Sequence, residues 1–330
     1  MLSKTYGSGL VAQIYALLEH PSKLRKSTRR GALLHVDSQR LAYVLLRRLR
    51  VPSLVVCHDV LSFTGAFADR SYEAKGWVTR ALRQTALARG LRVADCIVCP
   101  SEFTRRQVAG IFPTLRTRPR VIPWGVDTSR FRPQDRQASR SILGLPPGRS
   151  ILLAVGTESP RKNLEQLFRA FARIRKTVDA ILLKVGRPRE PVRSSLLTLC
   201  TSLNLLDDVV FIDEMPSARM PAVYAAADAF VQPSLYEGFG IPPLEALSCG
   251  TPVVASRIPS HQEVLGDAAH FVDPGAEDDL VSGLAEILTD RGLARMLSER
   301  GPQRASQFPW SRCVDGYMEA YAGLATLETF

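Results

Sequence analysis

Short apolar runs alternate with amphipathic stretches along most of the chain. Apolar runs bounded by Gly, Pro or polar residues are typical of buried strands, and apolar residues spaced three or four positions apart are typical of helices that face a core. Their alternation predicts an α/β protein with largely parallel sheets. In the first half, strands are expected at residues 32–36, 53–57, 96–98 and 120–122, and helices at residues 10–18, 40–49, 78–91 and 102–111.

The second half of the chain has a more regular pattern, which predicts a complete doubly wound domain. Strands are expected at residues 151–155, 181–185, 209–211, 229–231, 253–255 and 270–272, and the last helices at residues 276–288, 294–307 and 311–327. Residues 128–149 are rich in Pro, Gly and charged side chains, with one short helical pattern at 136–143. We therefore predict the domain junction there.

Two carboxylates lie close to the point where one of these strands ends. Pro242 and Pro243 suit the first positions of a helix, where a missing N–H costs nothing, and Gly250 suits its end. Glu237 then lies in the loop that leaves the strand, and Glu245 in the first turn of the helix. Loops at the carboxyl ends of parallel strands are where open α/β folds bind ligands.

The chemistry of this loop predicts the class of ligand. Gly238 and Gly240 let the backbone approach a bound group closely, and free N–H groups at the start of the helix favour an anion. Glu237 and Glu245 would repel a bare phosphate, but they suit hydroxyl groups as hydrogen-bond acceptors. The residues therefore predict a sugar–phosphate compound, bound through backbone N–H groups at its charge and through carboxylates at its hydroxyls.

Glu237 and Glu245, within the segment 232–256, resemble the donor signature of the retaining nucleotide-sugar glycosyltransferases of family 4. Residues 120–133, 153–164 and 220–228 resemble further segments of that family. The resemblance implies the GT-B fold, in which two Rossmann-like, doubly wound domains face a cleft and a C-terminal helix crosses back to the first domain. The expected domains are an acceptor-side domain at 1–130, a donor-binding domain at 131–310 and the returning helix at 311–330.

The resemblance also implies the residues that contact the donor. Arg161 and Lys162 are expected in the first turn of a helix, where cations oppose the helix dipole and a bound diphosphate would remove the conflict. Thr157 stands where many relatives carry an Arg, so either phosphate binding depends more on these two cations, or Glu158 marks a subgroup with different donor contacts. The expected donor-binding residues are Gly9, Gly156, Thr157, Arg161, Lys162, Gly238, Phe239, Gly240, Ile241 and Glu245.

Polar residues also end a buried strand in the first half. His58 and Asp59 either cap the next element or, as the resemblance implies, orient a sugar hydroxyl or the acceptor. The expected catalytic residues are Glu237, His58 and Asp59. His35 and Asp37 follow the preceding strand and are further acceptor-side candidates. Residues 7–9 resemble the family's glycine loop, but only six residues precede them, so we expect either a late start or a missing first strand.

The predicted function is transfer of a hexose from a nucleotide-diphosphate sugar to a glycan or lipid-linked acceptor, with retention (a hexosyltransferase, EC 2.4 class). Arg161 and Lys162 would stabilise the departing diphosphate, Glu237 would orient the sugar, and Glu245 would hold the ribose. The resemblance implies same-face attack without a covalent nucleophile. The alternatives are a catalytically silent relative that acts as a binding or scaffold subunit, and a sugar-nucleotide epimerase, which would need a water-handling acid/base pair.

Composition narrows the class of protein. A chain of 330 residues fits two domains, and no run of eighteen apolar residues or signal-peptide layout occurs, so we expect a cytoplasmic protein. The net charge of +11 suits nucleic acid, anionic lipid or simply a solvated Arg-rich surface. No nucleic-acid-binding module is visible, so we prefer peripheral contact with an anionic inner membrane face. No Asp-x-Asp occurs, and the six cysteines lack zinc spacing, so neither a metal nor a cofactor is expected.

Overall fold

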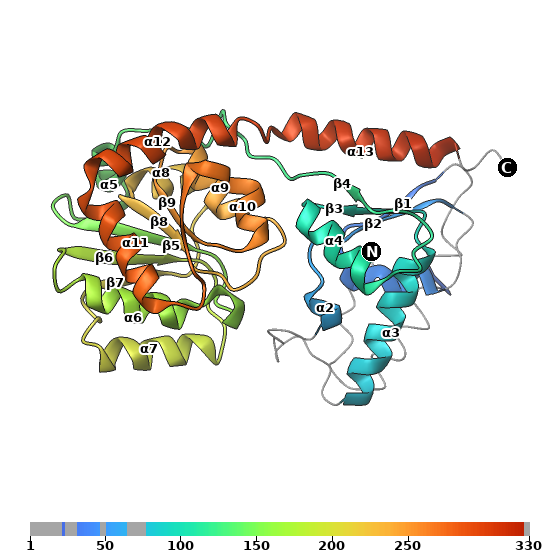
Figure 1. Cartoon of the computed structure of the whole chain (residues 1–330), viewed down its shortest axis with the longest axis horizontal. Coiled ribbons are helices and arrows are strands. Elements are labelled where there is room, and N and C mark those ends of the chain that lie inside the picture. The colour runs from blue at the N-terminus through green and yellow to red at the C-terminus, as the bar shows by residue number, and fades with distance from the viewer. Residues whose placement is uncertain (1–21, 24–31, 47–50, 65–76, 327–330) are drawn as a thin grey trace. The chain divides into compact units, whose positions relative to one another are not determined.

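The computed structural model describes residues 22–23, 32–46, 51–64 and 77–326. The chain divides into two compact units, of which unit 1 comprises Met1–Pro123 with Arg312–Phe330 and unit 2 comprises Trp124–Ser311. Each unit is built around one parallel β-sheet (Figure 1). The predicted α/β class with parallel sheets is therefore confirmed.

Unit 1 contains a sheet in the order β1-β2-β3-β4, with every neighbouring pair parallel. Its strands are β1 (Leu34–Val36), β2 (Ser53–Val56), β3 (Cys96–Cys99) and β4 (Arg120–Val121). Its helices before the last are η1 (Gln39–Leu46), α2 (Leu61–Thr64), α3 (Trp77–Val93) and α4 (Glu102–Ile111). The expected strands and the helix at 102–111 are confirmed, whereas the expected helix at 10–18 and the glycine loop at 7–9 lie outside the described residues.

The helix expected at 40–49 is present over the described residues as the 3-10 helix Gln39–Leu46. This element packs closely on α3, where a Cβ at Gly90 would lie 1.9 Å from the Ala42 carbonyl oxygen. Its first residue, Gln39, is buried and bonds through its side chain to the loop after β2. Tertiary contacts therefore hold this helix both at its start and against α3.

The last helix, α13 (Trp310–Ala325), packs within unit 1. The Tyr321 hydroxyl lies 2.6 Å from Nδ1 of His35, and the His35 ring stacks on Tyr317 with centroids 5.6 Å apart. Gly316 faces Ile122, which follows β4. The predicted return of the C-terminal helix to the first domain is confirmed, and His35 is engaged with that helix.

Unit 2 contains a six-stranded parallel sheet in the order β10-β9-β8-β5-β6-β7. Its strands are β5 (Ser150–Val155), β6 (Ala180–Val185), β7 (Val209–Ile212), β8 (Ala229–Gln232), β9 (Val253–Ser256) and β10 (Ala269–Val272). The chain winds outward from β5 to β7, and then restarts at β8 on the other side of β5. The winding direction therefore reverses between β5 and β8, which is the point where open α/β sheets form a ligand crevice.

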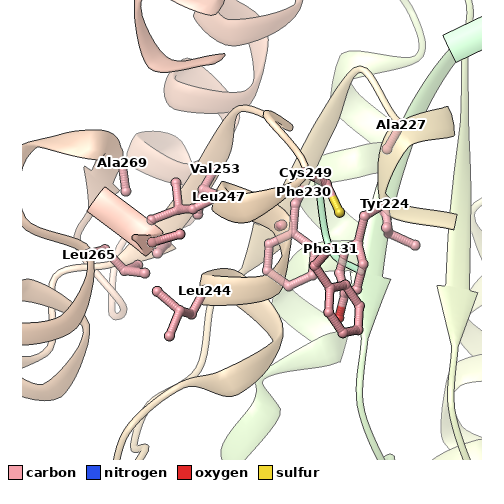
Figure 2. Close-up of a cluster of buried hydrophobic side chains, with 14 of the residues drawn as sticks. Phe131, Tyr224, Ala227, Phe230, Leu244, Leu247, Cys249, Val253, Leu265 and Ala269 are labelled. Carbon is pink, nitrogen blue, oxygen red and sulfur yellow. The ribbon is translucent and has the colours of Figure 1, made fainter. Parts of the chain in front are cut away.

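Helices cover both faces of this sheet, so its strands are buried on both sides and read as continuous apolar runs. The helical elements are α5 (Arg136–Leu143), η2 (Pro160–Lys162), α6 (Leu164–Ile174), α7 (Val192–Ser202), η3 (Ser217–Arg219), α8 (Met220–Ala226), α9 (Ile241–Ser248), α10 (Pro259–Leu265), η4 (Gly266–Ala268), α11 (Glu277–Thr289) and α12 (Arg291–Ala305). Alternate residues of β5 enter opposite clusters, with Ile151 and Leu153 in one, and Leu152 and Ala154 in the other. Figure 2 shows the first cluster, where side chains from α8 and α9 surround Phe230 of β8.

Close packing of α12 on α9 gives a test of this fold. A Cβ at Gly301 would lie 2.7 Å from the Leu247 carbonyl oxygen. We expect Gly301→Ala to lower the free energy of unfolding by about 1–3 kcal/mol, because overpacking outweighs the gain in helix propensity. In the control Gly323→Ala, a Cβ meets nothing within 4 Å, so stability should stay or rise by up to about 1 kcal/mol. Equal urea midpoints for the two variants would contradict this packing.

Candidate functional site

The candidate site lies where the loops after β5 and β8 emerge from the sheet. These two strands are neighbours and run parallel, with Leu152 opposite Ala229 and Leu153 opposite Phe230. Their carboxyl ends therefore meet at the same edge, at the reversal point of the winding. The loop after β5 carries Gly156 through Lys162, and the loop after β8 carries Glu237 through Gly240.

Arg161 and Lys162 lie in the separate 3-10 turn η2. The helix expected at these positions is limited to this one 3-10 turn, because Asn163 adopts a left-handed conformation with φ of 54° and α6 begins only after it. The turn is fastened to the loop after β8 instead. The Leu235 N–H donates to the Arg161 carbonyl at 2.8 Å, and Nη1 of Arg161 donates to the Tyr236 carbonyl at 3.2 Å.

Glu237 joins the two loops through a buried ion cluster. Its Oε2 lies 2.5 Å from Nη1 of Arg161, and its Oε1 lies 2.7 Å from Nζ of Lys162. Oε1 also accepts hydrogen bonds from the Ser234 hydroxyl at 2.9 Å and the Gln232 amide at 3.3 Å. The structure thus brings together the predicted sugar-binding carboxylate and the predicted phosphate-binding cations, and two positive charges against one negative leave the cluster with net charge +1.

The electrostatics of this cluster keep Glu237 ionised. Burial alone would raise the pKa of Glu237, but Lys162 and Arg161 lower that pKa to well below its ordinary value. Burial lowers the pKa of Lys162, and the neighbouring Glu237 opposes that shift. The carboxylate and the ammonium therefore face each other as a charged pair, each compensating the desolvation of the other.

His261 and Gln232 support the cluster from behind, and the sequence reasoning missed both. His261 is fully buried, and its Nδ1 lies 3.0 Å from the Ser256 carbonyl oxygen, which assigns the proton to Nδ1. Its Nε2 then accepts from the Gln232 amide at 3.4 Å. Burial lowers the pKa of His261 to about 4, although Glu237 opposes the shift, so the ring is neutral at pH 7. A polar residue that ends the buried strand β8 was the available signal for Gln232.

The start of α9, after Gly238 and Gly240, offers an anion fewer backbone N–H groups than the sequence suggested. Gly240 has φ of 113° and precedes α9, whose next positions are Ile241, Pro242 and Pro243. The two prolines carry no N–H, so Ile241 is the donor of these three positions. The side chain of Phe239 is buried against Trp124 and Phe308, so this residue offers a ligand only its backbone.

Glu245 lies on α9, apart from the ion cluster, and it follows the first turn of the helix instead of lying in it as predicted. Its Oε2 accepts a hydrogen bond of 2.6 Å from the Tyr224 hydroxyl. Burial raises the pKa of Glu245, while the bond from Tyr224 and the charge of Arg130 oppose the shift. The sequence reasoning identified Glu245 but missed Tyr224, because residues on two different helices meet here only in the folded chain.

Gly156 makes room for one of the two cations. Its φ of 140° is open to glycine, and a Cβ there would lie 3.2 Å from Cε of Lys162. The Lys162 side chain therefore passes directly over this turn to reach Glu237. Thr157 is exposed next to it. Glu158 is fully buried, and its Oε1 lies 2.6 Å from Nη2 of Arg193. Its carboxylate therefore has a structural partner and is not exposed to a ligand.

A second buried charge network holds the turns after β5 and β6. Nζ of Lys184 donates to the Gly156 carbonyl at 2.8 Å and to the Gly186 carbonyl at 3.3 Å, and lies 3.8 Å from Oε1 of Glu158. Burial lowers the pKa of Lys184 to about 8, and Glu158 opposes the shift. A lysine inside the apolar run at 180–185 was the signal that sequence reasoning passed over. This network stabilises the turn at Gly156, which the Lys162 side chain contacts.

The first-half candidates His58 and Asp59 belong to unit 1. Oδ1 of Asp59 accepts from the Leu61 N–H at 2.9 Å, so Asp59 caps α2, which is one of the two roles left open. Nε2 of His58 lies 2.6 Å from the Asp37 carbonyl oxygen. Catalytic roles for both residues stay predictions. Gly9 lies outside the described residues.

The described residues were predicted to hold no metal ion and no helix that spans a membrane. Among them, no group of three or more His, Cys, Asp or Glu side chains is arranged to hold a metal ion. None of the helices in the described ranges has the length and apolar content needed to cross a bilayer. The six cysteines are unpaired and buried. The arginine-rich segments at 25–30 and 47–50 of the sequence lie outside the described ranges.

Two family models match the chain. The model for glycosyl transferases group 1 matches residues 135–304, which is more than half of the chain, and the model for glycosyltransferase family 4 matches residues 11–130. The D-inositol 3-phosphate glycosyltransferase of Nocardia farcinica is 30% identical over 293 residues, covering 86% of this chain and 64% of the relative. That of Acidothermus cellulolyticus is 33% identical over 240 residues, covering 69% and 53%. The chain thus spans about half to two thirds of the length of these relatives.

Solved structures show the same fold. Sucrose-phosphate synthase from Thermosynechococcus elongatus superposes with a TM-score of 0.79 at 25% identity, covering 96% of this chain and 79% of that one. Anabaena Alr3699/HepE in complex with UDP-glucose superposes with a TM-score of 0.77 at 19% identity, covering 94% and 84%.

The buried network behind the site predicts a large stability effect. Glu158→Gln removes the buried counter-charge of Lys184 and leaves Arg193 with Asp213 alone, so the free energy of unfolding should fall by about 3–5 kcal/mol. The matched control is Glu214→Gln, which removes an exposed pairing with Arg187 and should change stability by less than about 0.5 kcal/mol. Urea denaturation of both variants measures the difference. Similar midpoints would show that the network contributes little.

His261 predicts a pH dependence of stability. Its pKa is near 6.5 in an unfolded chain and about 4 when folded, so the unfolded state takes up a proton first as the pH falls. This group should therefore cost about 3 kcal/mol of stability between pH 6.5 and pH 4. We expect the wild type to lose more stability than His261→Gln over that range, as measured by urea denaturation at each pH. Parallel curves for the two proteins would contradict a buried, neutral His261.

Proposed function

Because the chain belongs to the glycosyl transferases group 1 family, we propose that it transfers a hexose from a nucleotide-diphosphate sugar to an acceptor hydroxyl, with retention. Its predicted resemblance to family 4 and its GT-B fold are confirmed. The observation that carries the proposal is the buried contact of Glu237 with both Arg161 and Lys162 at the reversal point of the sheet.

The net positive charge of this cluster suits a diphosphate. A donor phosphate brings its own negative charge to Arg161 and Lys162. The ion pairs of these two cations with Glu237 are then weakened. The carboxylate is then available to accept hydrogen bonds from sugar hydroxyls. Since the first three positions of α9 provide the N–H of Ile241 alone, the two side-chain cations carry most of the charge compensation.

The proposed step breaks the bond between the anomeric carbon and the diphosphate oxygen, and the bonding electrons leave with the diphosphate. Positive charge grows on the sugar, and Arg161 and Lys162 stabilise the negative charge that grows on the leaving group. The acceptor oxygen bonds to the same face of the anomeric carbon, and its proton passes to the departing phosphate. Glu237 orients the sugar and is a poor nucleophile, because two cations hold its charge.

Similar proteins suggest which donor and which acceptor to test first. HepE, which shares the fold, holds UDP-glucose, so UDP-glucose is the first donor to test. The sequence favours a glycan or lipid-linked acceptor, whereas relatives named for inositol 3-phosphate favour a phosphorylated polyol. Peripheral contact with an anionic membrane surface is a further proposal, supported by the net charge of +11.

Separate effects on binding and transfer test the proposed roles. Lys162→Met and Arg161→Met should each weaken binding of nucleoside diphosphate by about tenfold or more, because each removes a phosphate partner. Glu237→Gln should keep or strengthen that binding, because it removes a competing carboxylate, while transfer falls by about 100-fold or more. Calorimetry gives the affinities, and release of nucleoside diphosphate from UDP-, GDP- and ADP-glucose gives the rates.

The control is Lys176→Met, which removes an exposed lysine of unit 2 and should change neither quantity. Binding without any release across these donors would favour the silent relative, and a rearranged donor sugar without transfer would favour the epimerase. If none of the diphosphates binds, or if Lys162→Met binds them as the wild type does, the proposed donor site is wrong.

A further inference from the structure

We propose that Tyr224 is a positioning residue that holds the Glu245 carboxylate ready for the ribose hydroxyls of the donor nucleotide. The inference rests on the proposed function. Tyr224 itself does not contact the substrate, but it orients Glu245, which does. Its basis is the hydrogen bond of 2.6 Å from the Tyr224 hydroxyl to Oε2 of Glu245.

The Tyr224 ring is held rigidly inside the core of unit 2. It is fully buried on α8, with ring centroids 6.0 Å from Phe131 and 5.9 Å from Phe230. Figure 2 shows the Tyr224 and Phe131 side chains together in this cluster. The Tyr224 carbonyl accepts a hydrogen bond of 2.8 Å from the Thr251 hydroxyl, which fixes the backbone as well. The phenol oxygen is therefore a fixed point to which a mobile side chain can be tied.

Glu245 is held on one side only. Oε2 is occupied by Tyr224, whereas Oε1 has no hydrogen-bond partner in the part of the chain that the structure describes, and the residue is partly exposed. A carboxylate with one oxygen anchored and one open is preorganised to accept hydroxyl groups, because its rotamer is set before the ligand arrives. Glu237, by contrast, has donors on both oxygens.

The hydrogen bond also favours the charged form of Glu245. Burial raises the pKa of Glu245, and Tyr224 on α8 and Arg130 before α5 oppose that rise. A further titratable group nearby is Cys249 directly after α9, where burial and Glu245 raise the thiol pKa to about 12, so the thiol stays neutral. Burial and Glu245 likewise raise the pKa of Tyr224, which keeps its proton as the donor. Without the phenol, Glu245 would lose its charge at a higher pH.

Tyr224→Phe tests the proposal, because it keeps the ring and removes the hydroxyl. UDP, GDP and ADP are first titrated into the wild type, and the tightest of them is used with its 2′-deoxy counterpart. We expect the variant to bind the ribonucleotide about tenfold more weakly at pH 7.5, as for loss of a hydrogen bond to a charged group. The ratio of ribo- to deoxyribonucleotide affinity should shrink, and the loss of affinity in acid should begin at a higher pH.

The control is Tyr321→Phe, which removes a hydrogen bond of the same length to His35 in unit 1 and should leave nucleotide affinity unchanged. In a Glu245→Gln background, Tyr224→Phe should weaken nucleotide binding by less than about a further twofold, because the carboxylate that it positions is already gone. This comparison also tests the proposal if the single variant is unstable. A purely structural role would lower the melting temperature without altering the pH profile or the ribose preference, and would overturn the proposal. If the wild type binds no nucleotide while folded, the proposed function itself fails.

Discussion

The buried contact of Glu237 with Arg161 and Lys162 is the interaction on which the rest of the site depends. Charges removed from water need partners, and here the two cations and the carboxylate come from loops that follow two different strands of the sheet. Arg161 and Lys162 follow β5, and Glu237 follows β8. The contact therefore exists only because β8 pairs with β5, so the sheet order and the charge pairing support each other.

The surroundings of this contact explain how it is kept in place. Lys184 and Glu158 hold the turn beneath Lys162, while His261 and Gln232 support the far side of Glu237. Both supports are polar and buried, which makes them costly unless every partner is present. These buried contacts hold Glu237 and Lys162 in place before any ligand is bound.

Much of the fold could be predicted from the sequence, because buried parallel strands leave long apolar runs such as 151–155 and 181–185. The loop of Glu237 and the helix of Glu245 were also predictable from their prolines and glycines. The start of α6 was not, since a left-handed Asn163 separates Arg161 and Lys162 from that helix. The partners of Glu237 and Glu245 could not be predicted either, because they depend on pairing between elements that are distant in the chain.

The two prolines at the head of α9 have a consequence for how donor preference can change. In many phosphate sites the anion is held by backbone amides, which substitutions other than to proline leave in place. Here Pro242 and Pro243 withhold two such amides, so in the proposed donor site the phosphates are bound mainly by the side chains of Arg161 and Lys162. A single substitution can change a side chain that binds the donor. The phosphate-binding part of the proposed donor site can therefore evolve more readily than one built from backbone amides.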